Sequence, residues 1–101
     1  MSEFEGKRMP KLLNEEEIRE GLDELNGWEL QGKKLYKAYE FEIFVEAFGF
    51  MSRVGLIAEK LGHHPELYNA YNQVEIHLIT EELGGVSELD MELAHRIDRL
   101  D

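Results

Sequence analysis

The segment that most constrains the fold of this chain is the run of residues 43–61. Its apolar side chains recur with the period of an α-helix but occupy two adjacent stripes. The first stripe holds Phe44, Phe48, Met51, Gly55 and Ala58, and the second holds Ile43, Ala47, Phe50, Val54, Ile57 and Leu61. A single sheet covers only one stripe, so we expect a helix over Ile43–Leu61 whose other stripe packs against a second copy of the chain. The alternative is that a hairpin of the same chain covers it.

The segments on either side alternate between helical and strand patterns. Asn14 is typical of an N-cap and begins a capping box, which predicts a helix over about Glu15–Leu25. Ser87 and Asp90 form a second capping box and predict the start of a final helix. Between the helices, alternating and aromatic-rich segments predict two pairs of antiparallel strands. These strands are expected at residues 28–30 and 35–41 around the turn 31–33, and at residues 67–71 and 73–80.

The predicted order of elements is α-β-β-α-β-β-α. Two hairpins covered by helices indicate an α+β fold of two layers, in which three helices lie on one face of a four-stranded antiparallel sheet. Residues 1–11 are polar and contain Pro10, so we expect a flexible N-terminal arm there. Residues 12–101 are sufficient for one hydrophobic core, and we expect them to form a single domain.

Composition argues against several classes of function. The chain has 22 acidic and 11 basic residues and a formal charge of −11, which opposes direct binding to nucleic acids or anionic membranes. It has no cysteine to form a disulfide, a thiolate metal site or a thiol nucleophile. No apolar run reaches membrane-spanning length, and residues 1–7 lack the basic start and apolar centre of a targeting signal. We therefore expect a cytoplasmic protein.

Two adjacent histidines, His63 and His64, are the main candidates for chemistry. Gly62 and Pro65 flank the pair and place it where the helix over residues 43–61 has to stop. The C-terminal end of a helix carries partial negative charge, which favours imidazolium near neutral pH. The pattern indicates an acid–base site, and the alternative is a pair of polar residues in a helix-terminating loop.

Four stretches of the sequence together resemble a known family. They are Ala47–Val54, Glu59–Glu66, Asn69–Asn72 and Gly85–Asp90. They closely resemble the pterin-4a-carbinolamine dehydratases, a family also known as the dimerisation cofactor of a homeodomain transcription factor, and the likeness extends from Leu13 onward. The resemblance implies a four-stranded antiparallel sheet with helices on one face, in agreement with the order predicted above.

This resemblance also implies an activity, which is dehydration of 4a-hydroxytetrahydrobiopterin to quinonoid dihydrobiopterin. The reaction recycles the pterin cofactor of aromatic amino acid hydroxylases. It needs an acid for the departing 4a-hydroxyl and a base for the N5 proton, without a bound metal, a cofactor or a redox step. By the matching positions, His63 resembles an acid–base residue at the 4a-hydroxyl, and His64 resembles a catalytic residue in contact with the pterin. Glu59, Pro65 and Asp90 are implied as groups of the substrate pocket.

Glu81 departs from the family pattern, which usually has a third histidine or a tryptophan at this position. An ionised carboxylate accepts a proton but donates one poorly unless burial favours its protonated form. We therefore predict that His63 acts as the acid and Glu81 as the base, with weakened or lost catalysis as the alternative. His77 does not replace the missing residue, because it lies about 13 Å of extended strand before Glu81.

Two hypotheses from other classes remain open. His63, His64 and Glu81 are the ligand types of an iron-binding facial triad, although adjacent histidines in an extended segment point apart, so we expect no metal. The second hypothesis is a non-catalytic scaffold or assembly factor, because dehydratase-like proteins include a transcriptional dimerisation cofactor and assembly factors for the carbon-fixing enzyme of carboxysomes. Glu81 and the doubly apolar helix favour this hypothesis. In either case we expect a homodimer or homotetramer formed through the helix Ile43–Leu61 and the edge strands.

Structural explanations compete with a functional one at four of these positions. The capping box explains Asp90 as well as a pocket does. Glu59 is equally consistent with a solvated helix residue. His77 and His95 are best explained as structural histidines.

Overall fold

The computed structural model describes residues 9–100, so residues 1–8 of the predicted arm and Asp101 lie outside the described part of the chain. The elements are α1 (Glu15–Leu22), β1 (Glu29–Gln31), β2 (Lys34–Glu40), α2 (Phe44–Leu61), β3 (Glu66–Ala70), β4 (Gln73–Leu78), the 3-10 helix η1 (Glu81–Leu83) and α3 (Glu88–Asp98). The predicted order α-β-β-α-β-β-α is confirmed, and η1 is an addition that the sequence did not predict.

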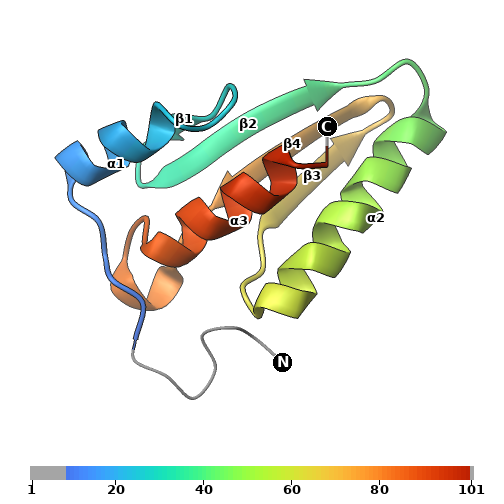
Figure 1. Ribbon diagram of the computed structural model, residues 1–101. Coiled ribbons are helices and arrows are strands. Elements are labelled where there is room, and N and C mark those ends of the chain that lie inside the picture. Colours follow the sequence, from blue (N-terminus) through green and yellow to red (C-terminus); the bar gives the residue numbers. More distant parts are fainter. Residues whose placement is uncertain (1–8, 101) are drawn as a thin grey trace.

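The four strands form one antiparallel sheet in the order β1-β2-β4-β3. The strands β2 and β4 are central, and β1 and β3 are the edges. In Figure 1 the three α-helices lie on one face of the sheet, and no described element covers the opposite face. The predicted α+β fold of two layers is therefore confirmed.

The core lies between the sheet and the helices because successive strand residues point to opposite faces. In β4, Val74, Ile76 and Leu78 are fully buried, whereas His77 on the open face contacts the ring of Tyr36 at a centroid distance of 4.8 Å. The helices supply further buried apolar residues, which include Ala47, Phe50, Val54, Ala58 and Leu61 of α2 and Leu93, Ala94 and Ile97 of α3. The alternation seen in the sequence thus places β4 against the helices.

The outer side of α2 keeps a large apolar surface. Phe44, Phe48 and Leu56 are 44%, 50% and 72% exposed. Within residues 9–100 no hairpin covers this side, so the alternative of coverage by the same chain does not hold for the part of the protein that the structure describes. Despite this surface, none of the described helices is long and apolar enough to cross a membrane.

Several element boundaries differ from the predicted ones. The helix α1 ends at Leu22, because the N–H of Leu25 donates to the carbonyl three residues back in a tightened turn. Leu25 is nevertheless buried, as its place in the helical stripe predicts. Ile43 precedes α2 as its N-cap and is 49% exposed rather than part of the buried stripe. The strand β4 ends before Thr80, whose side chain has a different role described below.

Asp98, the last residue of α3, attaches this helix to the sheet. Its carboxylate accepts hydrogen bonds from the backbone N–H of Asn26 at 2.9 Å, Trp28 Nε1 at 2.8 Å and Lys37 Nζ at 3.1 Å. The Lys37 ammonium also lies 4.7 Å from the centroid of the Tyr39 ring. These contacts fix the C-terminal end of α3 to the segment before β1 and to β2, and the opposite end of α3 carries the candidate site.

Candidate active site

The position of His63 follows from the way in which α2 ends. Gly62 adopts a left-handed conformation with φ of 79°, which favours glycine because a Cβ would be strained there. The N–H of Gly62 donates to the carbonyl of Glu59 and the N–H of His63 donates to that of Ala58, both at 3.2 Å. This pair of bonds is a Schellman motif. It stops α2 at Leu61 and places His63 in the segment that follows the helix.

Asp90 is placed by the capping box that the sequence predicted at the start of α3. The Asp90 Oδ2 atom accepts the backbone N–H of Ser87 at 2.8 Å, and the Ser87 hydroxyl accepts the N–H of Leu89 at 3.1 Å. The Asp90 side chain is completely buried. A carboxylate in this position offsets the positive end of the helix dipole.

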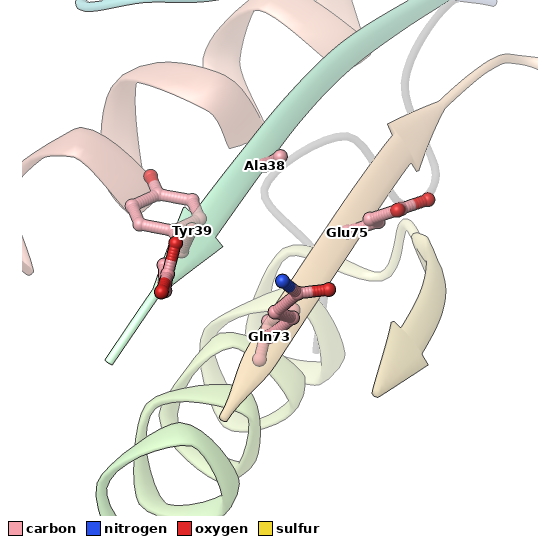
Figure 2. Close-up of a pocket in the computed structure, with 6 residues that line it drawn as sticks. Ala38, Tyr39, Gln73 and Glu75 are labelled. Carbon is pink, nitrogen blue, oxygen red and sulfur yellow. The ribbon is translucent and has the colours of Figure 1, made fainter. Parts of the chain in front are cut away.

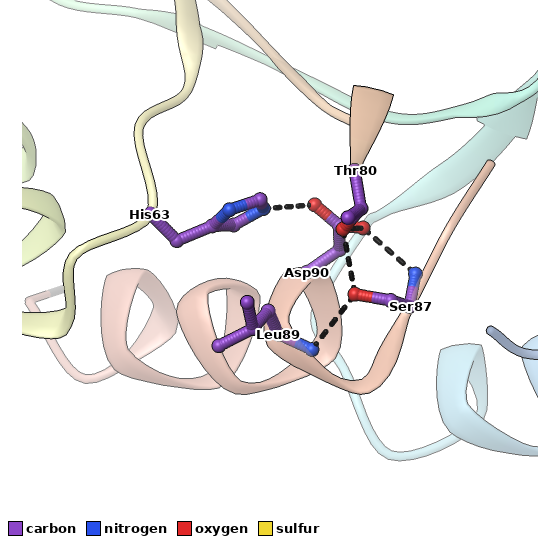
Figure 3. Close-up of polar contacts among 5 residues, drawn as sticks. All are labelled: His63, Thr80, Ser87, Leu89 and Asp90. Atoms are coloured by element: carbon purple, nitrogen blue, oxygen red, sulfur yellow. Dashed lines mark hydrogen bonds and ion pairs between the residues drawn. The ribbon is translucent and has the colours of Figure 1, made fainter. Parts of the chain in front are cut away.

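His63 and Asp90, which are 27 residues apart, meet between the end of α2 and the start of α3. The distance from His63 Nε2 to Asp90 Oδ1 is 2.6 Å, and the His63 side chain is only 12% exposed. Figure 3 shows the imidazole ring reaching from the segment after α2 to the first turn of α3. Asp90 is therefore both the helix cap that the sequence predicted and the partner of His63, and its place in a substrate pocket stays a prediction.

Thr80 and Ser87 surround the other oxygen of Asp90, and the sequence did not identify this arrangement. Thr80 Oγ1 donates to Asp90 Oδ2 at 2.7 Å and lies 2.6 Å from Ser87 Oγ. Both residues are buried, and Figure 3 shows them on the side of the carboxylate away from His63. Thr80 is held in place by a bridge to Gly85, whose carbonyl accepts its N–H at 2.9 Å. The capping box pointed to Ser87, but no pattern in the sequence marked Thr80.

His64 points to a different carboxylate from its neighbour. Its Nε2 atom lies 2.7 Å from Glu59 Oε1, and the two side chains are 66% and 78% exposed. The hydrogen bond from His64, followed by the charge of its protonated ring, lowers the pKa of Glu59 below its ordinary value. Because solvent screens such a pair, its contribution to stability is small. His64 and Glu59 therefore form an open polar surface next to the buried pair of His63 and Asp90.

The other two residues predicted for the site lie in two different connecting segments, one before β3 and one after β4. Pro65 is partly buried and leads from His64 into β3. Glu81 is exposed and begins η1 directly after Thr80. An exposed carboxylate lacks the burial that favours a proton donor, which leaves Glu81 suited to accept a proton.

The described residues do not assemble a metal centre. Within residues 9–100 there is no group of three or more His, Cys, Asp or Glu side chains that could hold a metal ion. His63 and His64 instead face two different carboxylates, those of Asp90 and Glu59 respectively. The geometry of a facial triad is absent from this part of the chain.

A shallow pocket of about 280 Å³ lies at the start of β4, the end of the strand that is far from Thr80 and Asp90 (Figure 2). It begins at Gln73, whereas Thr80 lies beyond the other end of the strand, roughly 20 Å away along an extended chain. Glu40 and Glu75 are the charged residues of its lining. The pocket contains none of the predicted site residues and is separate from His63.

The arrangement around His63 is suited to proton transfer. A buried carboxylate that is hydrogen-bonded to one ring nitrogen fixes the orientation of a histidine and stabilises the imidazolium formed when the other nitrogen takes up a proton. His63 with Asp90 has this geometry, and the exposed His64, Glu59 and Glu81 carry further polar groups. The chain therefore offers one oriented acid–base residue, with the exposed groups of Glu59 and His64 near it in the sequence and the exposed carboxylate of Glu81 directly after Thr80.

Comparisons with known proteins agree with one another. A family model described as pterin 4 alpha carbinolamine dehydratase matches residues 11–100. A relative from Sinorhizobium fredii, named as a candidate pterin-4-alpha-carbinolamine dehydratase, is 45% identical over 92 residues, which are 89% of this chain and 88% of the relative.

Two solved structures are similar to the whole fold. A transcriptional coactivator/pterin dehydratase from Brucella melitensis is 42% identical, with a TM-score of 0.82 over 87% of this chain and 96% of that one. A pterin dehydratase-like protein, described as a RuBisCO assembly factor in the alpha-carboxysome, is 28% identical, with a TM-score of 0.63 over 74% of this chain and 89% of that one. On this similarity, which spans nearly the whole sequence, the chain belongs to the pterin-4a-carbinolamine dehydratase family.

Proposed function

We propose that this protein dehydrates 4a-hydroxytetrahydrobiopterin to quinonoid dihydrobiopterin. The observation that carries the proposal is the distance of 2.6 Å between His63 Nε2 and the fully buried carboxylate of Asp90. Family membership supports the same reaction. We further propose that the reaction takes place in the cytoplasm and recycles the pterin cofactor of aromatic amino acid hydroxylases.

The proposed reaction breaks one C–O bond and moves two protons. His63 donates a proton to the 4a-hydroxyl, the C4a–O bond breaks, and water leaves. Glu81 takes the proton from N5, and the electron pair of that N–H bond forms the C4a–N5 double bond. The net change is loss of water without oxidation or reduction, so the step needs only an acid and a base. His64, Glu59 and Pro65 are proposed to contact the pterin ring, with Asp90 acting through His63.

The first test concerns His63. We expect His63→Ala to lower kcat by about 100-fold or more, because general acid catalysis typically contributes that much. The matched control is His77→Ala, since this histidine lies on the open face of the sheet against Tyr36. In an assay of pterin dehydration the control should remain within about twofold of wild type. Equal activity of wild type and His63→Ala would contradict the role of His63.

The second test concerns Glu81. We expect Glu81→Gln to lower kcat by about tenfold to 100-fold, because the amide cannot accept the N5 proton. Glu82→Gln is the matched control, because this neighbouring residue of η1 is also an exposed carboxylate. If Glu81→Gln were as active as the control, Glu81 would not be the base. A gain of activity in Glu81→His over an inactive wild type would overturn the enzymatic proposal itself.

A second candidate function is that of an oligomeric scaffold or assembly factor. The observation that favours it is the exposed apolar side of α2, where the rings of Phe44 and Phe48 lie 5.6 Å apart. Such a surface on a helix is typical of an interface. The similarity to a pterin dehydratase-like RuBisCO assembly factor is consistent with this function. A wild-type rate no faster than spontaneous dehydration would favour the scaffold over the enzyme.

We propose that in either function the chain forms a homodimer or homotetramer through α2 and the edge strands. Phe48→Glu is expected to reduce the mass of the assembly measured by sedimentation, because it places a charge in an apolar interface. Gln73→Glu is the control, since it adds the same charge at an exposed position of the central strand β4, outside α2 and the edge strands. A monomeric wild type, or an assembly unchanged by Phe48→Glu, would contradict this proposal.

A further inference from the structure

We propose that the hydroxyl groups of Thr80 and Ser87 are positioning groups that keep the proton of neutral His63 on Nε2. This makes Nδ1 the ring atom that exchanges a proton with the substrate. The inference deepens the proposed function and rests on it for the identity of the substrate. The assignment of the proton itself follows from the hydrogen bonds among buried residues.

The direction of these hydrogen bonds is set by the groups at either end. A backbone N–H can only donate, so Ser87 Oγ accepts from Leu89 N at 3.1 Å. An ionised carboxylate can only accept, so Thr80 Oγ1 donates to Asp90 Oδ2 at 2.7 Å. Each hydroxyl has one proton. The contact of 2.6 Å between the two hydroxyls is therefore made by the Ser87 proton, which is donated to Thr80.

This chain of donors leaves only one oxygen of Asp90 for His63. Oδ2 already accepts two hydrogen bonds, one from the Thr80 hydroxyl and one from the Ser87 N–H. Oδ1 faces His63 Nε2 at 2.6 Å, and the Asp90 side chain has no exposed surface. Three donors around a buried carboxylate hold its negative charge in place. His63 Nε2 must then carry a proton, because two acceptors at this distance would repel each other.

The other nitrogen of the ring is available to a ligand. In the part of the chain that the structure describes, Nδ1 of His63 has no hydrogen-bond partner. The buried side-chain nitrogen and oxygen atoms of these residues that lack a hydrogen-bond partner do not include Nδ1, so Nδ1 is not buried. The atom is therefore reached by solvent. In the neutral ring Nδ1 holds a lone pair, and in the imidazolium it holds the proton that can be donated. Proton exchange with a pterin hydroxyl is thus assigned to Nδ1.

Thr80 also connects this network to the proposed base. Its backbone N–H and carbonyl pair with Gly85, and it is the N-cap of η1, which Glu81 begins. The same residue therefore fixes the Asp90 carboxylate through its side chain and the start of η1 through its backbone. A Thr80 variant with a side chain of the same shape but no hydroxyl would remove the contact with Asp90 and keep the backbone contacts at the start of η1.

The test compares Thr80→Val, which removes the hydroxyl at nearly constant volume, with Thr80→Ser, which keeps it. We expect Thr80→Val to lower kcat about tenfold with KM unchanged, because a hydrogen bond to a charged group is lost. Thr80→Ser should restore kcat to within about threefold of wild type. A Thr80→Val enzyme as active as wild type, or a Thr80→Ser enzyme as impaired as Thr80→Val, would overturn the positioning role.

A second measurement does not depend on activity. Full-length protein labelled with 15N-histidine reports the tautomer of each ring, and the His63 signals are identified by their loss in His63→Gln. We expect neutral His63 to carry its proton on Nε2, with slow exchange with water that becomes at least about tenfold faster in Thr80→Val than in Thr80→Ser. A proton on Nδ1, or equal exchange in both variants, would overturn the inference. If wild type fails to dehydrate the pterin while these spectra agree, the proposed function fails and the positioning of His63 stands.

Discussion

The carboxylate of Asp90 is completely buried and accepts hydrogen bonds from separate parts of the chain. It caps α3 through the Ser87 N–H, holds Thr80 in the segment after β4 through the Thr80 hydroxyl, and orients His63 after α2. A buried charge without partners would be strongly destabilising, so the folded state needs these hydrogen bonds to keep the Asp90 carboxylate buried. One side chain therefore links the end of α2, the segment after β4 and the start of α3 at this end of the molecule.

This arrangement explains why a small domain can present an oriented histidine. The Schellman motif at Gly62 brings His63 to the start of α3, and the capping box brings Asp90 to the same place. Both motifs are local, and both supply hydrogen bonds to backbone groups that a helix end leaves without a partner inside the helix. The acid–base geometry thus arises from helix termini that the fold requires in any case. Asp98 plays the corresponding structural part at the other end of α3, where its partners include Trp28 and Lys37.

Local patterns predicted much of this structure because they depend on neighbouring residues. The alternation of Val74, Ile76 and Leu78 predicted a strand with one buried face, and the capping boxes at Asn14 and Ser87 predicted two helix starts. The position of His63 beyond the end of α2 likewise followed from Gly62.

What the sequence could not predict depends on contacts between distant segments. Thr80 and Asp90 meet across a turn through Gly85, and the pairing of His63 with Asp90 spans 27 residues. A hydroxyl at a strand end has no periodic signature, so Thr80 was missed. The early end of α1 at Leu22 was missed because the buried Leu25 fits the helical stripe equally well from a turn.

The most direct test of the link between fold and site is to measure Asp90→Asn for both stability and dehydration rate. If the amide nitrogen of the new side chain faced the Ser87 N–H, the capping hydrogen bond would be lost. If it faced His63 Nε2, this ring nitrogen would have to accept a hydrogen bond, and the neutral ring would carry its proton on Nδ1 instead. We expect the free energy of unfolding in urea to fall by about 2–4 kcal/mol and the rate of the folded variant to fall about 100-fold or more. A folded Asp90→Asn protein with wild-type stability, or one that is less stable yet dehydrates the pterin at the wild-type rate, would contradict the account.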